Sequence, residues 1–458
     1  MTDGPHPLHP PAADRAASAL AAEGGFQALA QGLGEAYLGA FALRLGAGGL
    51  SLGLVATLPT AAGSMAQTVA RRERAGHGVA RAFIARAWSA QALGYASLGL
   101  CLLLTPAFAV PALCVLAFLA WGCGGMANPA WSSLVSGVVP RARHGWFFGH
   151  RGALQQVGML AAILGGAALL SAMTERGSEG IGFALLFVLA GVARLAGAGV
   201  LVGVPALEAP GPRPSRARGF GILRGSGKFR RLALYLWCLH LATYVSTPFF
   251  VPYMLDELRF SYALIGALVA TPAIVKVCTL RLWGRLADRV GPGPLLRATG
   301  WLVVIVPGLW VVSRSLLWIL AAQIYSGIVW GAFELAQASS ILQATRGRQR
   351  DVALFNAVDG GVMIAGSLLG GATVNLWAGR PGPGYLAAML LSTILRALPA
   401  LALLWRVRGI GRPAISHLML PLRVFAVRPT RGISLQADPE LPPEPLRAAS
   451  SHPPSTAP

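Results

Sequence analysis

Twelve apolar runs, each about 20 residues or longer, follow one another along this chain of 458 residues. The composition agrees, because the chain is 55% hydrophobic and only 12% charged, about half the charged fraction of a soluble domain. Inside a bilayer, backbone polar groups must be satisfied within each segment, so such runs form helices. We therefore predict an all-α membrane protein with transmembrane helices at residues 26–46, 48–70, 79–104, 109–138, 147–172, 181–204, 231–255, 261–283, 294–313, 316–343, 352–378 and 384–406.

Arginine is concentrated in every second loop between these runs. The loops at 71–74, 141–143 and 346–350 are rich in arginine, whereas residues 107–110 carry no charge. Arginine-rich loops stay on the cytoplasmic side of a membrane, so the pattern predicts that both termini are cytoplasmic. It also accounts for the net charge of +21 better than nucleic-acid binding does. We expect a multi-pass protein of the bacterial inner membrane, with no nucleic-acid partner.

The longest of the arginine-rich loops divides the chain into halves. Residues 205–230 are rich in Pro, Gly and Arg, which predicts a mobile linker between two bundles of six helices. Residues 1–25 lack the apolar core of a signal peptide, and residues 407–458 hold many Pro and Ser residues. We predict a disordered cytoplasmic N-terminus, a bundle at 26–204, the linker, a second bundle at 231–406 and a mostly disordered cytoplasmic tail.

The two halves repeat each other. Leu54–Thr57 recurs as Leu268–Thr271, and Arg194 recurs as Arg396 in the last helix of each half. Each match is weak in a chain dominated by Ala, Gly and Leu, but their common order indicates a duplication. Because each half contains six predicted helices, both halves begin on the same side of the membrane and form parallel repeats.

The sequence Trp-Gly-Arg-Leu-Ala-Asp-Arg-Val-Gly follows the second helix of the second half. It resembles the signature loop Gly-x-x-x-Asp-Arg-x-Gly of the major facilitator superfamily, with Gly284, Asp288, Arg289 and Gly291 at the matching positions. Residues 72–76 of the first half keep the acid, the arginine and the last glycine of this motif but lack its leading glycine. The resemblance therefore involves both halves, and the second half more closely.

The resemblance extends over about residues 26–406. It implies two parallel six-helix bundles that enclose a central site and rock to give it access from alternate sides. We expect the motif to form a cytoplasmic gate, in which Asp288 pairs with an arginine and accepts bonds from a helix N-terminus. Part of an antiporter motif is present at Gly158 and Gly165–Gly166, but its proline is absent, so antiport is not indicated.

Polar and aromatic side chains form a stripe on each helix that the resemblance assigns to the central cavity. Gln27, Gln31 and Glu35 of the first helix, for example, are four residues apart and share one face. Such a face points either into a water-filled cavity or into packing between polar helices, and we favour the cavity. The candidates for substrate or proton binding are Gln31, Glu35, Asn128, His240, Tyr244, Lys276, Trp330, Glu334 and Asp359.

Two of these candidates, Glu35 and Glu334, are acids deep inside apolar runs. Each either couples protons or binds substrate, or is the structural partner of an arginine on another helix, because a bare charge is costly in hydrocarbon. Asp359 either shares that role or satisfies a nearby helix. Lys276 either has a function or extends its ammonium group toward the membrane surface. His240 is either a proton relay or a core residue.

Arg194 and Arg396 lie near the middle of equivalent helices. A role shared by both halves is more typical of structure than of substrate recognition. We therefore expect these arginines to form buried pairs or to cap backbone carbonyls.

The sequence shows no metal-ligand cluster, phosphate-binding glycine loop or nucleophile elbow. We therefore expect no cofactor, no metal and no enzymatic activity. The function that fits best is secondary active transport of a small organic solute, coupled to protons, by a monomer in the lipid bilayer. The alternative is a sensor or partner subunit that has this fold without transporting.

Overall fold

The computed structural model describes residues 10–70, 77–139, 144–204, 227–345, 349–377 and 383–404. These residues form long helices joined by short turns. The predicted loops at 71–74 and 141–143, most of the linker and the predicted tail at 407–458 lie outside the described residues.

Each half contains six helical segments, and some of the segments are broken into two helices. The first half consists of α1 (Pro10–Gly34), α2 (Leu38–Arg44), α3 (Gly49–Ala70), α4 (His77–Ser97), η1 (Leu98–Leu103), α5 (Pro106–Val138), α6 (His144–Glu175) and α7 (Glu179–Val200). The second half consists of α8 (Gly227–Tyr244), α9 (Phe250–Asp256), α10 (Tyr262–Val290), α11 (Pro292–Val304), α12 (Val306–Val312), α13 (Leu316–Thr345), α14 (Gln349–Leu376) and α15 (Pro383–Ala402).

Within the described residues, ten segments are long and apolar enough to cross a membrane, judged by length and composition. The other two segments, α1 with α2 and α4 with η1, are more polar. Glu23 and Gln27 lie in α1, and Arg81 and Arg86 lie in α4. With these two segments the chain has the twelve-segment, all-α membrane architecture that its apolar runs predict.

Helix α1 begins at Pro10, well before residue 26, where the apolar pattern predicts its start. The prediction of a disordered terminus at 1–25 is therefore wrong for residues 10–25. Alanine is the strongest helix former, and a segment rich in alanine needs only a packing surface to be stable as a helix. That surface is provided by α6 and α7, along which α1 packs. The apolar residues buried there are Ala16, Ala17, Leu20 and Ala21.

The first segment of each half is broken near its middle. In the first half α1 ends at Gly34 and α2 begins at Leu38, and in the second half α8 ends at Tyr244 and α9 begins at Phe250. Pro248 accounts for the second break, because it lacks the N–H that would bond to the Tyr244 carbonyl in a continuous helix. In both halves the break leaves backbone groups without their regular helical partners.

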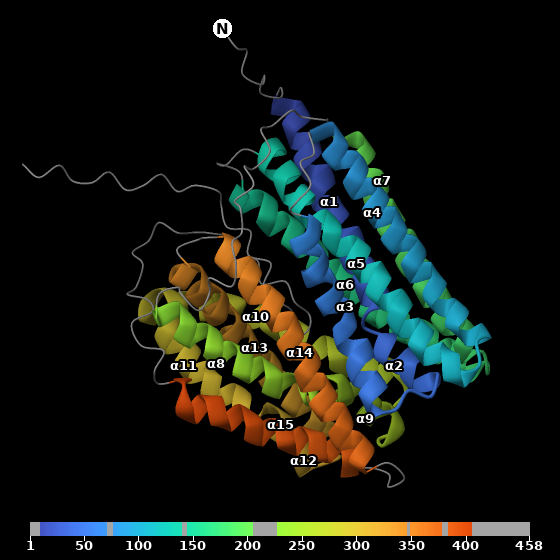
Figure 1. Ribbon diagram of the computed structural model, residues 1–458, viewed down its shortest axis with the longest axis vertical. Helices are drawn as coiled ribbons and strands as arrows, with labels where there is room; N and C mark the ends of the chain where they lie inside the picture. Colours follow the sequence, from blue (N-terminus) through green and yellow to red (C-terminus); the bar gives the residue numbers. More distant parts are fainter. Residues whose placement is uncertain are drawn as a thin grey trace, which may run out of the picture.

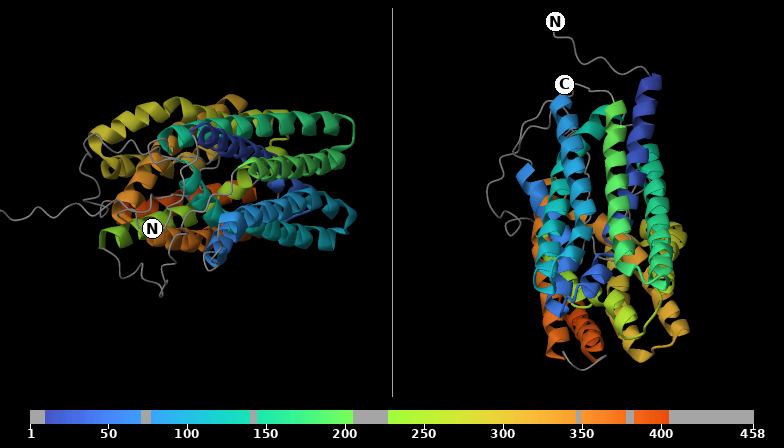
Figure 2. Two further views of the ribbon diagram at one scale, coloured as in Figure 1. Left: turned by 90° about the horizontal axis from the view of Figure 1, so that it is seen from above. Right: turned by 90° about the vertical axis from the view of Figure 1, so that its right-hand side faces the viewer.

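Figure 1 shows the two halves as separate bundles that meet near α2 and α9 and diverge from there. Figure 2 shows the long helices of the first half running side by side. The halves touch mainly through α3 with α14 and through α6 with α10. We call this meeting place, where residues 49–57 of α3 face residues 367–375 of α14, the closed end.

Polar bonds join α3 and α14 at the closed end. The Gly49 N–H donates to Asn375 Oδ1 at 2.8 Å, and the hydroxyls of Thr57 and Ser367 are 3.1 Å apart. The backbones of the two helices approach closely, because a Cβ added at Gly53 would lie 2.5 Å from the Ser367 carbonyl oxygen. Small residues at this contact therefore allow the two halves to touch.

Glu179, at the start of α7, bonds to both halves at the same end. Its carboxylate pairs with Arg44 of α2, and the Tyr262 hydroxyl of α10 donates to Oε1 of Glu179 at 2.5 Å. Nearby, the Ala263 N–H donates to the Ser171 hydroxyl of α6 at 2.8 Å. The second contact between the halves is thus also polar.

The predicted gate motif lies at the other end of α10. This helix continues through Gly284, Asp288 and Arg289, so most of the motif is helix and not the loop that we predicted. Gly291 ends the helix with a φ of 84°, a left-handed conformation that favours glycine, and Pro292 begins α11. Asp288 is exposed, and no hydrogen bond or ion pair joins it to another described residue.

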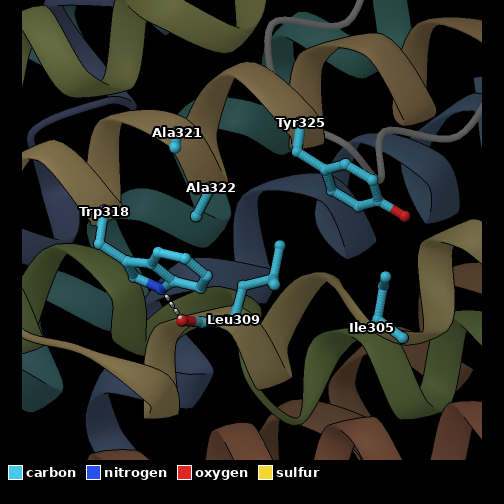
Figure 3. Close-up of a pocket in the computed structure, with 6 residues that line it drawn as sticks. All are labelled: Ile305, Leu309, Trp318, Ala321, Ala322 and Tyr325. Atoms are coloured by element: carbon cyan, nitrogen blue, oxygen red, sulfur yellow. Dashed lines mark hydrogen bonds between the residues drawn. The ribbon is translucent and has the colours of Figure 1, made fainter.

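A shallow hollow of about 190 Å³ lies on the surface of the second half, between α11–α12 and α13 (Figure 3). Across the hollow, the Trp318 Nε1–H donates a hydrogen bond to the Leu309 carbonyl at 2.6 Å. None of the predicted site residues lines it. The lining residues are Ile305, Leu309, Trp318, Ala321, Ala322 and Tyr325.

Candidate functional site

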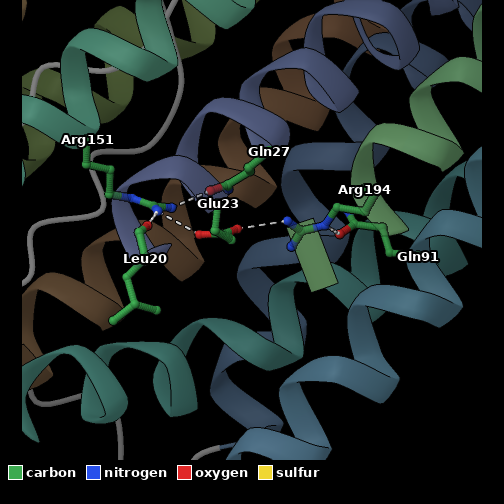
Figure 4. Close-up of polar contacts among 6 residues, drawn as sticks. All are labelled: Leu20, Glu23, Gln27, Gln91, Arg151 and Arg194. Carbon is green, nitrogen blue, oxygen red and sulfur yellow. Dashed lines mark hydrogen bonds and ion pairs between the residues drawn. The ribbon is translucent and has the colours of Figure 1, made fainter. Parts of the chain in front are cut away.

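The first half contains an ion-pair network around Glu23 of α1 (Figure 4). The Glu23 side chain is completely buried. Arg151 of α6 donates to Glu23 Oε2 at 2.6 Å, and Arg194 of α7 donates to Oε1 at 3.1 Å. One carboxylate thus neutralises part of the charge of two guanidinium groups that come from two other helices.

The other N–H groups of these arginines also have partners. Arg151 donates to the Leu20 carbonyl at 2.5 Å and to Gln27 Oε1 at 2.8 Å. Arg194 donates to Gln91 Oε1 of α4 at 2.7 Å. Arg194 therefore has the buried pairing that we expected from its position, and its structural role stays a prediction.

Each of the two arginines also stacks on a tryptophan. The Arg151 guanidinium carbon lies 4.4 Å from the ring centroid of Trp131 in α5, and that of Arg194 lies 4.0 Å from the ring of Trp88 in α4. An aromatic face attracts a cation and excludes water from it. The network thereby joins α1, α4, α5, α6 and α7 into one unit.

Glu23 and Arg151 were not among the predicted candidates. We missed Glu23 because we placed the start of the first helix at residue 26. A signal was present, however, since Glu23 continues the four-residue spacing of Gln27, Gln31 and Glu35. The structure also shows that Gln27 of this stripe bonds inside the first half, to Arg151.

Glu35 lies in the turn between α1 and α2 and is buried. Trp121 of α5 donates its Nε1–H to Glu35 Oε2 at 3.2 Å. The Tyr95 ring packs edge-on against Trp121, with 4.7 Å between ring centroids. Glu35 is therefore held by its own half, at the level where the first segment is broken.

The second half contains a buried ion pair between Lys276 of α10 and Glu334 of α13. Lys276 Nζ lies 2.6 Å from Glu334 Oε2, and both residues are less than 10% exposed. Lys276 therefore does not extend toward the membrane surface. The partner of Glu334 is a lysine, where the sequence suggested an arginine as the structural alternative.

A second buried pair joins His240 of α8 to Asp359 of α14. His240 Nδ1 lies 2.6 Å from Asp359 Oδ1, and both side chains are buried. The charge of Glu334 on α13 also acts on the His240 ring. The two pairs therefore form one group, which we call the four-residue cluster: His240, Lys276, Glu334 and Asp359.

Two carboxylate oxygens of the four-residue cluster lack partners. Glu334 Oε1 and Asp359 Oδ2 are buried, and neither has a hydrogen-bond partner among the described residues. Buried polar atoms are nearly always bonded to protein or to ordered water. Each of these oxygens is therefore a position where a proton or a water molecule would be stabilised.

Arg396 of α15 caps a backbone carbonyl, one of the two roles expected for it. It donates to the Val303 carbonyl at 3.0 Å and to the Ser246 hydroxyl at 3.4 Å. The Val303 carbonyl also accepts a backbone N–H at the end of α11 but cannot accept the regular helical bond from Pro307, which has no N–H, and the segment breaks between α11 and α12. Within the described residues Arg396 has no carboxylate partner, unlike its counterpart in the first half.

The other candidates are dispersed. Trp330 packs in the hydrophobic core of the second half, 5.5 Å from the Phe333 ring, and its place along a cavity stays a prediction. Tyr244 is buried at the end of α8, and Gln31 and Asn128 are half-buried in the first half. The common cavity predicted for Glu35 and Glu334 stays a prediction.

Comparison with known proteins gives a sequence match for the second half of the chain and structural matches for most of it. The second half matches the sequence model of the Major Facilitator Superfamily over residues 232–418. No curated protein matches the chain by sequence.

Three solved transporter structures are similar over most of their length. One is a bacterial homologue of the human lysosomal transporter Spinster in an inward-facing and occupied conformation. Its TM-score is 0.66 and its sequence identity 16%, and the match covers 89% of this chain and 100% of the homologue's chain. A POT family transporter in complex with 5-aminolevulinic acid has a TM-score of 0.65 and 12% identity, covering 86% and 97%. The nucleoside transporter NupG has a TM-score of 0.58 and 14% identity, covering 86% and 99%.

Identities this low establish the fold alone and transfer no substrate. They agree, however, with the sequence match, with the order of the helices and with the duplication of six-helix halves. The chain is therefore a multi-pass membrane protein with the major facilitator superfamily fold, and its second half matches that family by sequence.

Proposed function

We propose that this chain is a secondary active transporter, which moves a small organic solute across the membrane by alternating access and is coupled to protons. The observation that carries the proposal is the burial of ionisable side chains inside both bundles, at Glu35 in the first and in the four-residue cluster of the second. Charges at such depth are costly and mark ion or substrate pathways. The similar folds of a Spinster homologue, NupG and a POT transporter support solute transport as the class of function.

The closed end corresponds to the periplasmic side when the arginine-rich loops are cytoplasmic. The molecule then faces inward, with its halves apart where the gate motif lies. In the outward-facing conformation we expect Asp288 to pair with the first half and close the cytoplasmic side, because it lies at the exposed end of α10.

Proton coupling predicts that Glu35→Gln and Glu334→Gln each abolish accumulation driven by a pH gradient. Glutamine keeps the shape of the side chain but supplies neither a proton-binding group nor a negative charge. A thermal-shift screen of purified protein identifies the solute, since a bound ligand stabilises the folded state. Uptake of that solute into proteoliposomes is then measured with and without the gradient.

The exposed Glu175→Gln serves as the matched control and should transport normally. Unchanged gradient dependence in both buried variants would remove these acids from the mechanism. A solute that binds tightly but is never taken up would favour the sensor alternative.

The assigned orientation predicts which engineered cysteines react from outside the cell. In a cysteine-free background, Ser178→Cys should react with a membrane-impermeant maleimide in intact cells, because residue 178 lies in the turn before α7 at the closed end. Ser215→Cys and Ser450→Cys should react only after the membrane is permeabilised. Reaction at residue 215 in intact cells would reverse the topology.

A further inference from the structure

The four-residue cluster lacks one positive charge when His240 is neutral. Lys276 supplies one positive charge, whereas Glu334 and Asp359 supply two negative charges. The charged groups that act on the ring are Asp359 and Glu334, and those that act on Glu334 are Lys276 and His240. The arginines of the same helices lie toward the helix ends, Arg230 and Arg231 in the first turns of α8 and Arg281 and Arg285 in the last turns of α10.

Helices α13, α14 and α15 carry few other charges. Glu334 is the one charged residue of α13, and α8 also packs against α14 and α15. The arginine of α15, Arg396, bonds to the Val303 carbonyl. Asp351 lies in the first turn of α14, about two helical turns from Asp359. A buried net charge is unfavourable, so the cluster should take up one cation.

The contacts of the cluster favour a proton over a metal ion. His240 Nδ1 already lies 2.6 Å from a carboxylate oxygen, a distance typical of a charge-assisted hydrogen bond. Lys276 occupies one oxygen of Glu334 and would repel a metal ion at that position.

We propose that the four-residue cluster is a binding site for one exchangeable proton, carried by the imidazole ring of His240, which is paired with Asp359. Binding forms one N–H bond and gives the ring its positive charge; release returns the proton to water, and no other bond changes. The proposal rests on the proposed function, since it assigns the coupling proton to this site and gives Glu334 the role of a charge that holds it.

The cluster is also connected to the contact between the halves. Asp359 lies on α14, and the same helix carries Ser367 and Asn375, which bond to α3 at the closed end. Loss of the proton leaves Asp359 facing a neutral ring and weakens the attraction between α8 and α14. Proton release at Asp359 and separation of the halves at the closed end therefore both change the contacts of α14.

The charge balance is tested by ¹⁵N NMR of protein with labelled histidine in lipid nanodiscs at pH 7.5. The chain has eight histidines, and the spectrum of a His240→Gln variant identifies the His240 signals. Imidazolium and neutral imidazole differ clearly in their nitrogen shifts. We expect His240 to be charged in the wild type.

Glu334→Gln and Lys276→Met should change the charge of His240 in opposite directions. Glu334→Gln leaves one lysine and one carboxylate, so the ratio of charged to neutral His240 should fall by about ten-fold or more. Lys276→Met leaves two carboxylates and should keep the ring charged to a higher pH than in the wild type. The double variant leaves Asp359 alone, so the ring should be charged again.

The exposed Glu175→Gln is the control and should leave the signal unchanged. A neutral His240 in the wild type would overturn the proposal, and this result needs no variant apart from the His240→Gln protein that identifies the signal. The proposal would also be overturned if His240 had the same charge in Glu334→Gln as in Lys276→Met. Failure of transport with the expected NMR result would overturn the proposed function and leave the proton site intact.

Discussion

Replacing Glu23 with glutamine should destabilise the protein by about 3–5 kcal/mol, because it leaves two buried guanidinium groups without their shared carboxylate. Arg151 and Arg194 lie 2.6 Å and 3.1 Å from that carboxylate. The remaining acceptors, the Leu20 carbonyl and the Gln27 and Gln91 amides, carry no charge to oppose theirs. The loss is measured as a lower midpoint of thermal unfolding in detergent.

A double-mutant cycle separates the ion pair from simple loss of packing. Arg194→Gln should cost much less stability in the Glu23→Gln background than in the wild type. Glu175→Gln, at an exposed acid, should leave the unfolding midpoint within the usual scatter of surface substitutions. Equal costs of Arg194→Gln in the two backgrounds would contradict the network.

Replacing Gly53 with leucine should shift the protein away from the conformation seen here, by about ten-fold or more in population. A Cβ at this position would meet the Ser367 carbonyl oxygen of α14 at 2.5 Å, so the two helices cannot stay in contact. Overpacking of this kind costs about 1–3 kcal/mol, and a conformation with the closed end apart avoids that cost. Pulsed EPR distances between spin labels at positions 178 and 314 should lengthen.

Gly165→Leu is the matched control for this substitution. Gly165 lies on α6, and no atom would lie within 4 Å of its added Cβ. Its distance distribution should equal that of the wild type. If the distance distribution is unchanged in Gly53→Leu, or shifts equally in Gly165→Leu, the contact between α3 and α14 is not the one that opens.

The helices and the two halves could be predicted because their cause is local. Each apolar run is long enough to span hydrocarbon, and its backbone has to bond within itself. The start of the first helix could not be predicted in this way. Residues 10–25 are helical because α6 and α7 cover them. The apolar pattern of a segment contains no information about a packing surface that distant helices provide.

The polarity of the site residues was predictable, but their partners were not. An acid in an apolar run has to be paired, protonated or hydrated, so Glu334 and Asp359 could be identified from position alone. The choice of Lys276 for Glu334 and of His240 for Asp359 depends on how α8, α10, α13 and α14 pack. Lys276 and Glu334 are 58 positions apart in the chain, and His240 and Asp359 are 119 positions apart, so no spacing rule connects either pair.

The sequence by itself thus determined the membrane-spanning helices, the duplicated halves and those costly buried charges that lie inside apolar runs, such as Glu334 and Asp359, since each follows from composition within one segment. The tertiary structure alone added Glu23 and Arg151 to these charges and decided which charges meet. It united Glu23 with Arg151 and Arg194, and it gathered the four-residue cluster from four helices. The physical reason is that a charge pair forms through a distance of about 3 Å in space, which only the packing of the helices sets.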